Sequence, residues 1–139
     1  MRALALAPIR VAYAFYAAIT FLTLGCTALL AALILPGVYR RRAAARGIAR
    51  AFLWVAGMPL TVRGMERLAP GQCIVVANHA SYLDGLVFTA ALPARFSFVI
   101  KREMSAVPLA GLFLRRIGSE FVERFDRNRG AADARRVLR

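Results

Sequence analysis

The stretch "CIVVANHASYLDGLVFTAALP", residues 73–93, contains the elements that decide the fold. Its first five residues, 73–77, are a short apolar run rich in β-branched side chains, which is typical of a strand buried on both faces. A polar loop follows, and residues 82–92 have the composition of a helix that Pro93 ends. This order places the loop at the carboxyl end of a strand, where open α/β sheets hold their ligand sites.

Three other segments have the apolar or alternating pattern of short strands. They are "LTVRG" at residues 60–64, "RFSFVI" at residues 95–100 and "EFVER" at residues 120–124. Together with the strand at 73–77, they predict an α/β fold with at least some parallel strands. About 80 residues follow Leu60. Because a core of that size is marginal, we expect the domain to be the front portion of a longer one.

The segment "SAVPLAGLFLRRIG", residues 105–118, is predicted to be a second helix of this domain. Ser105 is a candidate N-cap, Arg115 and Arg116 complement the negative carboxyl end of the helix dipole, and Gly118 is suited to end the helix. The charged segment 131–139 is expected to open a further helix.

An uncharged stretch of 25 residues, Val11 to Leu35, precedes the domain and stops at Pro36-Gly37. A helix of about 20 apolar residues crosses a bilayer core, so this stretch is long enough to span. A signal peptide has a shorter apolar region of about 7–15 residues. A buried soluble helix is also possible, but a small domain could hardly cover a helix that is apolar all round.

A fourth possibility is a hairpin that dips into one leaflet and returns. The returning arm would be "IARAFLWVAGMPL", residues 48–60, which is too short to span and carries Trp54, a side chain suited to the membrane interface. Membrane attachment is expected in either case, whether the segment spans or re-enters.

The chain has a net charge of +13, and a cluster of arginines lies directly after the apolar stretch. The cluster consists of Arg40, Arg41, Arg42, Arg46 and Arg50. If the stretch spans, the positive-inside tendency places everything after Tyr39 in the cytoplasm. The cluster would also attract anionic headgroups, by about 1 kcal/mol per side chain. A solvated basic face is the simpler interpretation. Since there is no nucleic-acid recognition motif, we expect a membrane and no nucleic acid as the partner.

The chemistry-bearing residues of the chain are few. Cys26 and Cys73 do not form a metal pattern, and His79 is the only histidine. A zinc site is therefore not expected.

His79 and Asp84 lie five residues apart across the predicted bend from loop to helix. Such a bend can bring the carboxylate to one imidazole nitrogen and leave the other facing a substrate, which is the arrangement of a general base and its orienting partner. Because no G-x-S-x-G nucleophile is present, the proton would come from a hydroxyl of the substrate.

A structural role explains the same residues equally well. Ser81 would be an N-cap, and Asp84 at the third helical position would complete a carboxylate version of the capping box. His79 would then only satisfy loop carbonyls. The local pattern leaves both roles open.

The wider pattern resembles a known family. "NHASYLDGL" after an apolar strand is similar to the first motif of the glycerolipid acyltransferases, the 1-acylglycerol-3-phosphate acyltransferase family. "FSFVIKREMSAVPLAGLFLRRIGSEFVERFD" is similar to the next block of that family, which ends in G-x-x-F-(I/V)-x-R, here Gly118, Phe121, Val122 and Arg124. The resemblance covers roughly Leu60 to the end.

The resemblance implies that His79 is the general base on a hydroxyl of a lysophospholipid or glycerol phosphate, and that Asp84 orients it. Arg124 would bind the phosphate of the acceptor, a task that suits the guanidinium fork. The remaining substrate-site residues would be Lys101, Asn78, Ser81 and Gly118. The acyl donor would be acyl-CoA or acyl-carrier protein, with no other cofactor and no metal.

These expectations divide the chain into a membrane-anchoring helix or helical hairpin, residues 1–58, and the N-terminal part of an acyltransferase domain, residues 59–139. The location implied is a membrane, the bacterial inner membrane with the domain on its cytoplasmic side. The family's downstream E-G-T-R motif is missing, so these residues alone are expected to have little activity. The alternative is a truncated or degenerate membrane protein without catalysis, which binds anionic lipid through its arginine cluster.

Overall fold

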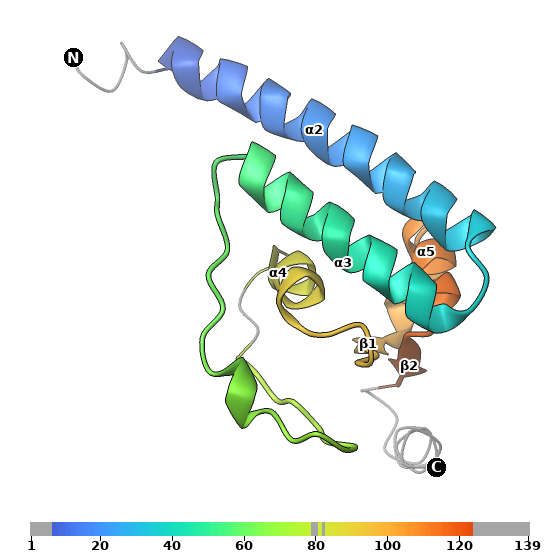
Figure 1. Ribbon diagram of the computed structural model, residues 1–139. Helices are drawn as coiled ribbons and strands as arrows, with labels where there is room; N and C mark the ends of the chain where they lie inside the picture. The colour runs from blue at the N-terminus through green and yellow to red at the C-terminus, as the bar shows by residue number, and fades with distance from the viewer. Residues whose placement is uncertain (1–6, 79–80, 82, 124–139) are drawn as a thin grey trace.

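The computed structural model describes residues 7–78, 81 and 83–123 (Figure 1). Most of the regular structure in this part of the chain is helical, and the strands are short. The helices are α2 (Ala7–Ile34), α3 (Val38–Val55), α4 (Leu83–Ala91) and α5 (Ala110–Arg116), with single 3₁₀ turns η1 (Met65–Arg67) and η2 (Arg102–Ala106), and the strands are β1 (Val99–Lys101) and β2 (Glu120–Val122).

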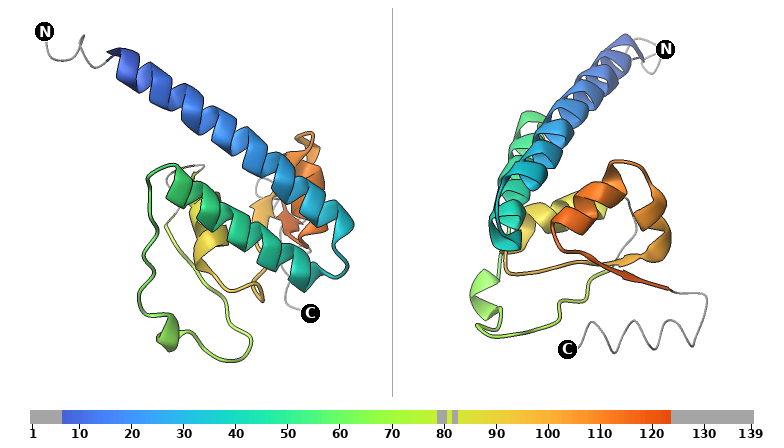
Figure 2. Two further views of the ribbon diagram at one scale, coloured as in Figure 1. Left: turned by 45° about the horizontal axis from the view of Figure 1, so that its top comes forward. Right: turned by 90° about the vertical axis from the view of Figure 1, so that its right-hand side faces the viewer.

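Helices α2 and α3 form an antiparallel hairpin, which is visible in both orientations (Figures 1 and 2). The turn between them contains Pro36 and Gly37, and Gly37 has a φ of 77°, a conformation that glycine adopts without strain. At the other end of the hairpin, the hydroxyl of Tyr13 donates to the carbonyl of Ala56 (2.7 Å) and that of Tyr16 to the carbonyl of Val55 (3.0 Å). The two helices of the hairpin are therefore connected at both ends.

The predicted apolar helix is confirmed, since α2 covers almost all of it. By length and composition α2 is the one described helix able to cross a membrane, and it is hardly buried within the protein. The returning arm differs from the prediction, because α3 begins at Val38 and takes the arginine cluster into the helix. Alanine and arginine are both strong helix formers, which explains why "RRRAAAR" continues the helix.

The buried core lies between α3 and α4. Ala49, Phe52 and Leu53 of α3 pack against Ala90 of α4, whereas Ala45 packs with Ala32 of α2 and Ile117. The small side chains of Ala49 and Ala90 let α3 and α4 approach closely. From the other side, Phe21 of α2 contacts Phe52 edge to face, with ring centroids 5.6 Å apart. Helix α3 is thus the central element. It is covered by α2 on one side and, on the other, by the α/β part of the chain, which begins with α4 and includes β1, α5 and β2 (Figure 2).

The sheet consists of β1 and β2, which pair in parallel with Val99 opposite Glu120 and Lys101 opposite Val122. The connection between them contains η2 and α5, as a parallel crossover requires. The predicted α/β class is confirmed in this one unit, within a chain that is mainly helical over its described residues. Both strands are shorter than predicted.

The structure contradicts two of the four strand predictions. Residues 60–64 and 73–77 belong to no sheet among the described residues, and the supposedly buried run 73–77 is largely exposed, with Ile74 at 78% and Val76 at 88%. A strand is stabilised by hydrogen bonds to a neighbouring strand, and within residues 7–78 and 83–123 only β1 and β2 are paired. Apolar β-branched composition does not replace that partner.

The predicted helix at 105–118 is shorter than expected, and Ser105 is not its N-cap. Val107 precedes Pro108 and is extended, with a ψ of 120°, because the proline ring disfavours the helical conformation of the residue before it. The predicted C-terminus is confirmed. Gly118 has a φ of 70°, and the amides of Gly118 and Ser119 donate to the carbonyls of Arg115 and Leu114 in a Schellman motif. The helix predicted at 131–139 lies outside the described residues.

Candidate functional site

The first turn of α4 shows the capping box that the sequence allowed. The carboxylate Oδ2 of Asp84 accepts the backbone N–H of Ser81 at 2.8 Å, and the hydroxyl of Ser81 accepts the backbone N–H of Leu83 at 3.1 Å. These two hydrogen bonds satisfy amides that a helix start leaves open, and such a cap contributes about 1 kcal/mol. The structural role of Ser81 and Asp84 is therefore confirmed.

Capping is compatible with the orienting role predicted for Asp84. A carboxylate has two oxygens with about four acceptor positions, and the bond to Ser81 fixes the orientation of the group at the positive end of the helix dipole. His79 lies outside the described residues, so its pairing with Asp84 stays a prediction. Asn78, the residue just before it, is exposed at the entrance to the loop.

Lys101, another of the predicted site residues, lies at the carboxyl end of β1, next to that of β2. Lys101 ends β1 and lies opposite Val122, two residues before Arg124. Beyond them, the guanidinium of Arg102 forms an ion pair with Glu123, with 3.8 Å between Nε and Oε2. Arg124 itself lies outside the described residues. The parallel register therefore places Lys101 beside the segment that leads directly to Arg124.

Gly118, the first residue of the G-x-x-F-V-x-R pattern, lies against α3. A Cβ added to it would be 2.9 Å from Nη2 of Arg42, closer than real Cβ contacts, and 3.0 Å from Cγ1 of Val38, a tight contact. Together with the positive φ, this contact explains the glycine by conformation and packing. A direct contact of Gly118 with substrate stays a prediction.

The arginines of α3 have a role that the sequence interpretation missed. Arg41, Arg42 and Arg50 donate hydrogen bonds to backbone carbonyls at or just beyond the carboxyl ends of three helices. Arg41 binds Leu35 after α2 and Arg116 in α5, Arg42 binds Ile117 and Gly118 after α5, and Arg50 binds Ala90 of α4. Cations are stabilising there, because the last carbonyls of a helix lack partners and carry the negative end of its dipole. The cluster is thus neither a simple solvated face nor wholly available to lipid.

One sequence signal did point to these contacts. The alanines between the arginines, Ala45 and Ala49, repeat at helical spacing next to Arg42, Arg46 and Arg50, and both are buried. A face that alternates alanine and arginine in this way is a packed face with long side chains at its rim. The identity of the carbonyls that they reach is set by tertiary packing and is not readable from the sequence.

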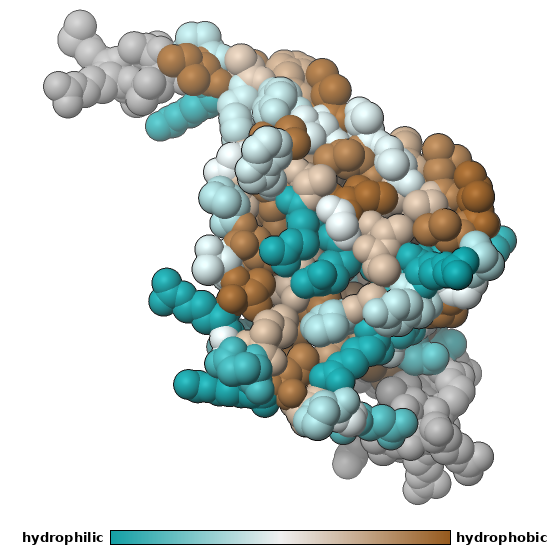
Figure 3. All heavy atoms as spheres, viewed as in Figure 1, coloured by the Kyte–Doolittle hydropathy of each residue, from teal (hydrophilic) through white to brown (hydrophobic). Residues whose placement is uncertain are grey.

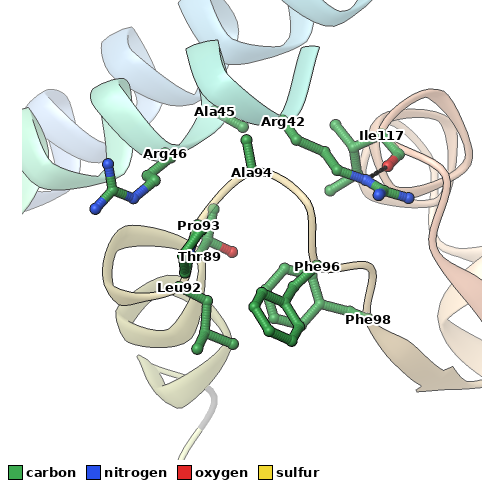
Figure 4. Close-up of a pocket in the computed structure, with 10 residues that line it drawn as sticks. All are labelled: Arg42, Ala45, Arg46, Thr89, Leu92, Pro93, Ala94, Phe96, Phe98 and Ile117. Atoms are coloured by element: carbon green, nitrogen blue, oxygen red, sulfur yellow. Dashed lines mark hydrogen bonds between the residues drawn. The ribbon is translucent and has the colours of Figure 1, made fainter. Parts of the chain in front are cut away.

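Among these arginines, Arg42 has the guanidinium on which burial acts most (Figure 4). Burial lowers the pKa of its guanidinium from the ordinary value, because desolvation disfavours the charged form. The cavity beside it, lined by α3, the loop after α4 and Ile117, has a volume of about 10 Å³. That is the space of one water molecule, so this is a packing contact and not a substrate site.

A larger open groove of about 330 Å³ lies beside the carboxyl end of α3, between Trp54, Arg50 and Leu60. The described residues include no group of three or more histidine, cysteine or acidic side chains suited to a metal ion. What the described site offers is a capped carboxylate at a helix start and a cation at the edge of a parallel sheet.

Comparison with known proteins gives this arrangement a context. A family model described as "Acyltransferase" matches residues 59–139. The 1-acyl-sn-glycerol-3-phosphate acyltransferase of Saccharomyces cerevisiae is 32% identical over 71 residues, which are 51% of this chain and 23% of the yeast protein. The chain thus spans less than a quarter of that relative. No solved structure matches.

Proposed function

The chain belongs to the acyltransferase family, and from this we propose that the protein transfers a fatty acyl group to the hydroxyl of a lysophospholipid such as 1-acylglycerol 3-phosphate. The donor in this proposal is acyl-CoA or acyl-carrier protein, and the product is a phospholipid. The observation that carries the proposal is the family match over the whole of residues 59–139, the part that contains both candidate motifs.

In the proposed reaction His79 is the general base. It takes the proton of the acceptor hydroxyl as the hydroxyl oxygen attacks the thioester carbonyl, so that a C–O bond forms and the C–S bond breaks. The proton then passes to the departing thiolate. Asp84 orients the imidazole and stabilises its cationic form, and its bond to Ser81 supports this task because it holds the carboxylate in one orientation.

The proposed acceptor site lies at the carboxyl edge of the sheet. The acceptor's phosphate would be bound by Arg124 and Lys101, and this is supported by the parallel pairing of β1 and β2, which sets Lys101 opposite Val122. A guanidinium is suited to bidentate contact with phosphate, and an ammonium adds a compact charge. Asn78 and Ser81 would support the loop that carries the base.

The hairpin is the proposed membrane attachment. Apolar side chains remain exposed along α2, including Ile9, Phe15 and Ile19, and brown apolar atoms appear along this helix in Figure 3. Trp54, 75% exposed at the far end of α3, is suited to the headgroup region.

Helix α2 is proposed to lie along one leaflet and not to cross the bilayer. It is fastened to α3 at both ends, by Arg41 to Leu35 and by Tyr13 to Ala56, so α3 would accompany it into the hydrocarbon. Helix α3 carries five arginines, and each arginine at the centre of a membrane helix costs about 2.5–3.5 kcal/mol on an insertion scale. An in-plane hairpin keeps these groups outside the hydrocarbon.

The experiment that tests the function is a transfer assay of the full-length protein in detergent, with labelled 1-acylglycerol 3-phosphate, glycerol 3-phosphate and a lysolipid without phosphate monoester as acceptors. We expect thioester-dependent acylation of 1-acylglycerol 3-phosphate and little of the third acceptor. Acylation of none of the three from either donor class would refute the proposal.

The alternative of a non-catalytic protein that binds anionic lipid through its arginine cluster has less support. Three of the five arginines donate to backbone carbonyls, which leaves fewer guanidinium N–H donors for headgroups.

A further inference from the structure

Arg42 connects the membrane hairpin to the starts of both strands. Its guanidinium donates through Nε to the carbonyl of Ile117 at 2.7 Å, through Nη2 to that of Gly118 at 2.9 Å, and through Nη1 to that of Arg95 at 3.4 Å (Figure 4 shows the first of these). Gly118 lies two residues before β2, and Arg95 four residues before β1. One side chain of α3 therefore binds the segments that lead into the N-terminal ends of two paired strands.

The same two strands lead to the proposed phosphate-binding cations at their other ends. Lys101 ends β1, and Arg124 follows β2 by two residues. The strands are only three residues long, and isolated two-stranded pairs are marginal in water. Their relative placement consequently depends on contacts from outside the sheet, and those of Arg42 are made to backbone atoms at the base of both.

Arg42 is closely packed against the backbone at Gly118. The backbone of Gly118 approaches Arg42 and Val38 so nearly that a Cβ would require one of these side chains to shift. The network also extends further. The side chain of Arg95, whose carbonyl Arg42 binds, donates to the carbonyls of Ala69 and Pro70, in the turn before the segment that leads to Asn78.

We propose that Arg42 is a positioning residue, through which the membrane-attached hairpin holds the phosphate-binding ends of β1 and β2 in place for the acceptor. This inference rests on the proposed function, and it adds a residue from outside residues 59–139, the part that the family model matches. Arg42 does not touch substrate in this account. It acts through the strand ends, so its loss should affect the acceptor and not the acyl donor.

The test compares Arg42→Ala and Arg42→Lys with Arg40→Ala in the full-length protein. Arg40 is the matched control, because it lies on the same helix, carries the same charge, and has an exposed side chain that makes no hydrogen bond to the described residues. The first readout is hydrogen exchange at the amides of residues 119–122, one of which, that of Glu120, donates to Phe98 at 2.8 Å. The second is the KM for 1-acylglycerol 3-phosphate and for the acyl donor.

In Arg42→Ala we expect faster exchange at residues 119–122, because the hydrogen bonds from Arg42 to the strand bases are lost. The KM for the acceptor should rise about tenfold, because the strand ends that bind its phosphate are then held less firmly. The donor KM should change by less than about twofold, as for a residue that acts on acceptor binding alone. Arg42→Lys, which keeps the charge and lacks the planar fork, should still raise the acceptor KM. Arg40→Ala should match the wild type in both readouts.

Unchanged exchange at residues 119–122 in Arg42→Ala would overturn the inference. So would exchange that rises equally throughout α2 and α4, or a KM that rises equally for donor and acceptor, since these describe a general stabilising contact. If the wild-type protein acylates no acceptor, the proposed function fails, while the exchange comparison with Arg40→Ala still decides whether Arg42 holds β2.

Discussion

Asp84 performs one structural task that the structure shows, the cap of α4, and one chemical task that is proposed. Two substitutions separate them. Asp84→Asn keeps an acceptor oxygen for the Ser81 amide and removes the charge, whereas Asp84→Ala removes both.

We expect Asp84→Ala to lose about 1 kcal/mol of folding stability through the cap, and Asp84→Asn to lose less. Both should lose most of the acyl transfer rate, because an amide cannot stabilise the imidazolium that forms. Thermal unfolding and initial rates measure the two effects. A wild-type rate in Asp84→Asn would reduce Asp84 to a capping residue.

Gly118 is the residue at which conformation and packing coincide. In Gly118→Ala, a positive φ costs about 1–2 kcal/mol and the new Cβ displaces Arg42 or Val38. We therefore expect a lower melting temperature together with a raised acceptor KM.

Gly47→Ala is the matched control for Gly118→Ala. Gly47 lies within α3, is exposed and has nothing within 4 Å of an added Cβ. This substitution should stabilise the protein by about 0.5–1 kcal/mol, since alanine favours the helix. Equal melting temperatures for the two variants would contradict the packing described for Gly118.

Among the elements, the α2–α3 hairpin has a proposed in-plane attachment to the membrane that cysteine labelling can test. In a variant without the native Cys26 and Cys73, a cysteine placed by Arg10→Cys reports which side of the membrane the start of α2 faces, since Arg10 is a charged, exposed side chain near the N-terminal end of that helix. For an in-plane hairpin, a membrane-impermeant maleimide should label this cysteine from the same side as the α/β part of the chain.

The control is Gly71→Cys in the same background, at an exposed position within the domain. Labelling of the two positions from opposite sides of sealed vesicles would show that α2 crosses the bilayer and would contradict the in-plane attachment.

The sequence predicted those elements whose signals are local. The length and apolarity of α2, Pro93 beyond α4 and Gly118 beyond α5 act within a few residues, and the structure confirms all three. The segment 73–77 failed because a strand depends on a neighbour distant in the chain, and composition does not reveal that neighbour. Ser105 failed because Pro108 moved the helix start, although the proline was visible in the sequence.

The candidate site was predictable to a similar degree. The cap formed by Ser81 and Asp84 followed from spacing, whereas the roles of Arg41, Arg42 and Arg50 required the tertiary structure. An arginine side chain reaches carbonyls far away in the sequence, and only packing selects which.

At the scale of the whole molecule, the hairpin and the α/β part are joined mainly through α3. Its buried face packs on α4, tyrosines of α2 donate to carbonyls at its carboxyl end, and its arginines bind the ends of α4 and α5. A membrane-bound hairpin would thus present the domain to lipid in a fixed orientation, which suits an enzyme whose acceptor is delivered from the bilayer.

The general-base role of His79 is tested most directly by the rate of acyl transfer from thioester to 1-acylglycerol 3-phosphate in His79→Ala, measured beside the wild type in the full-length protein. We predict a rate lower by a factor of about 10²–10⁴, with vesicle binding unchanged because the hairpin is intact. A wild-type rate of transfer in His79→Ala would contradict the proposed mechanism.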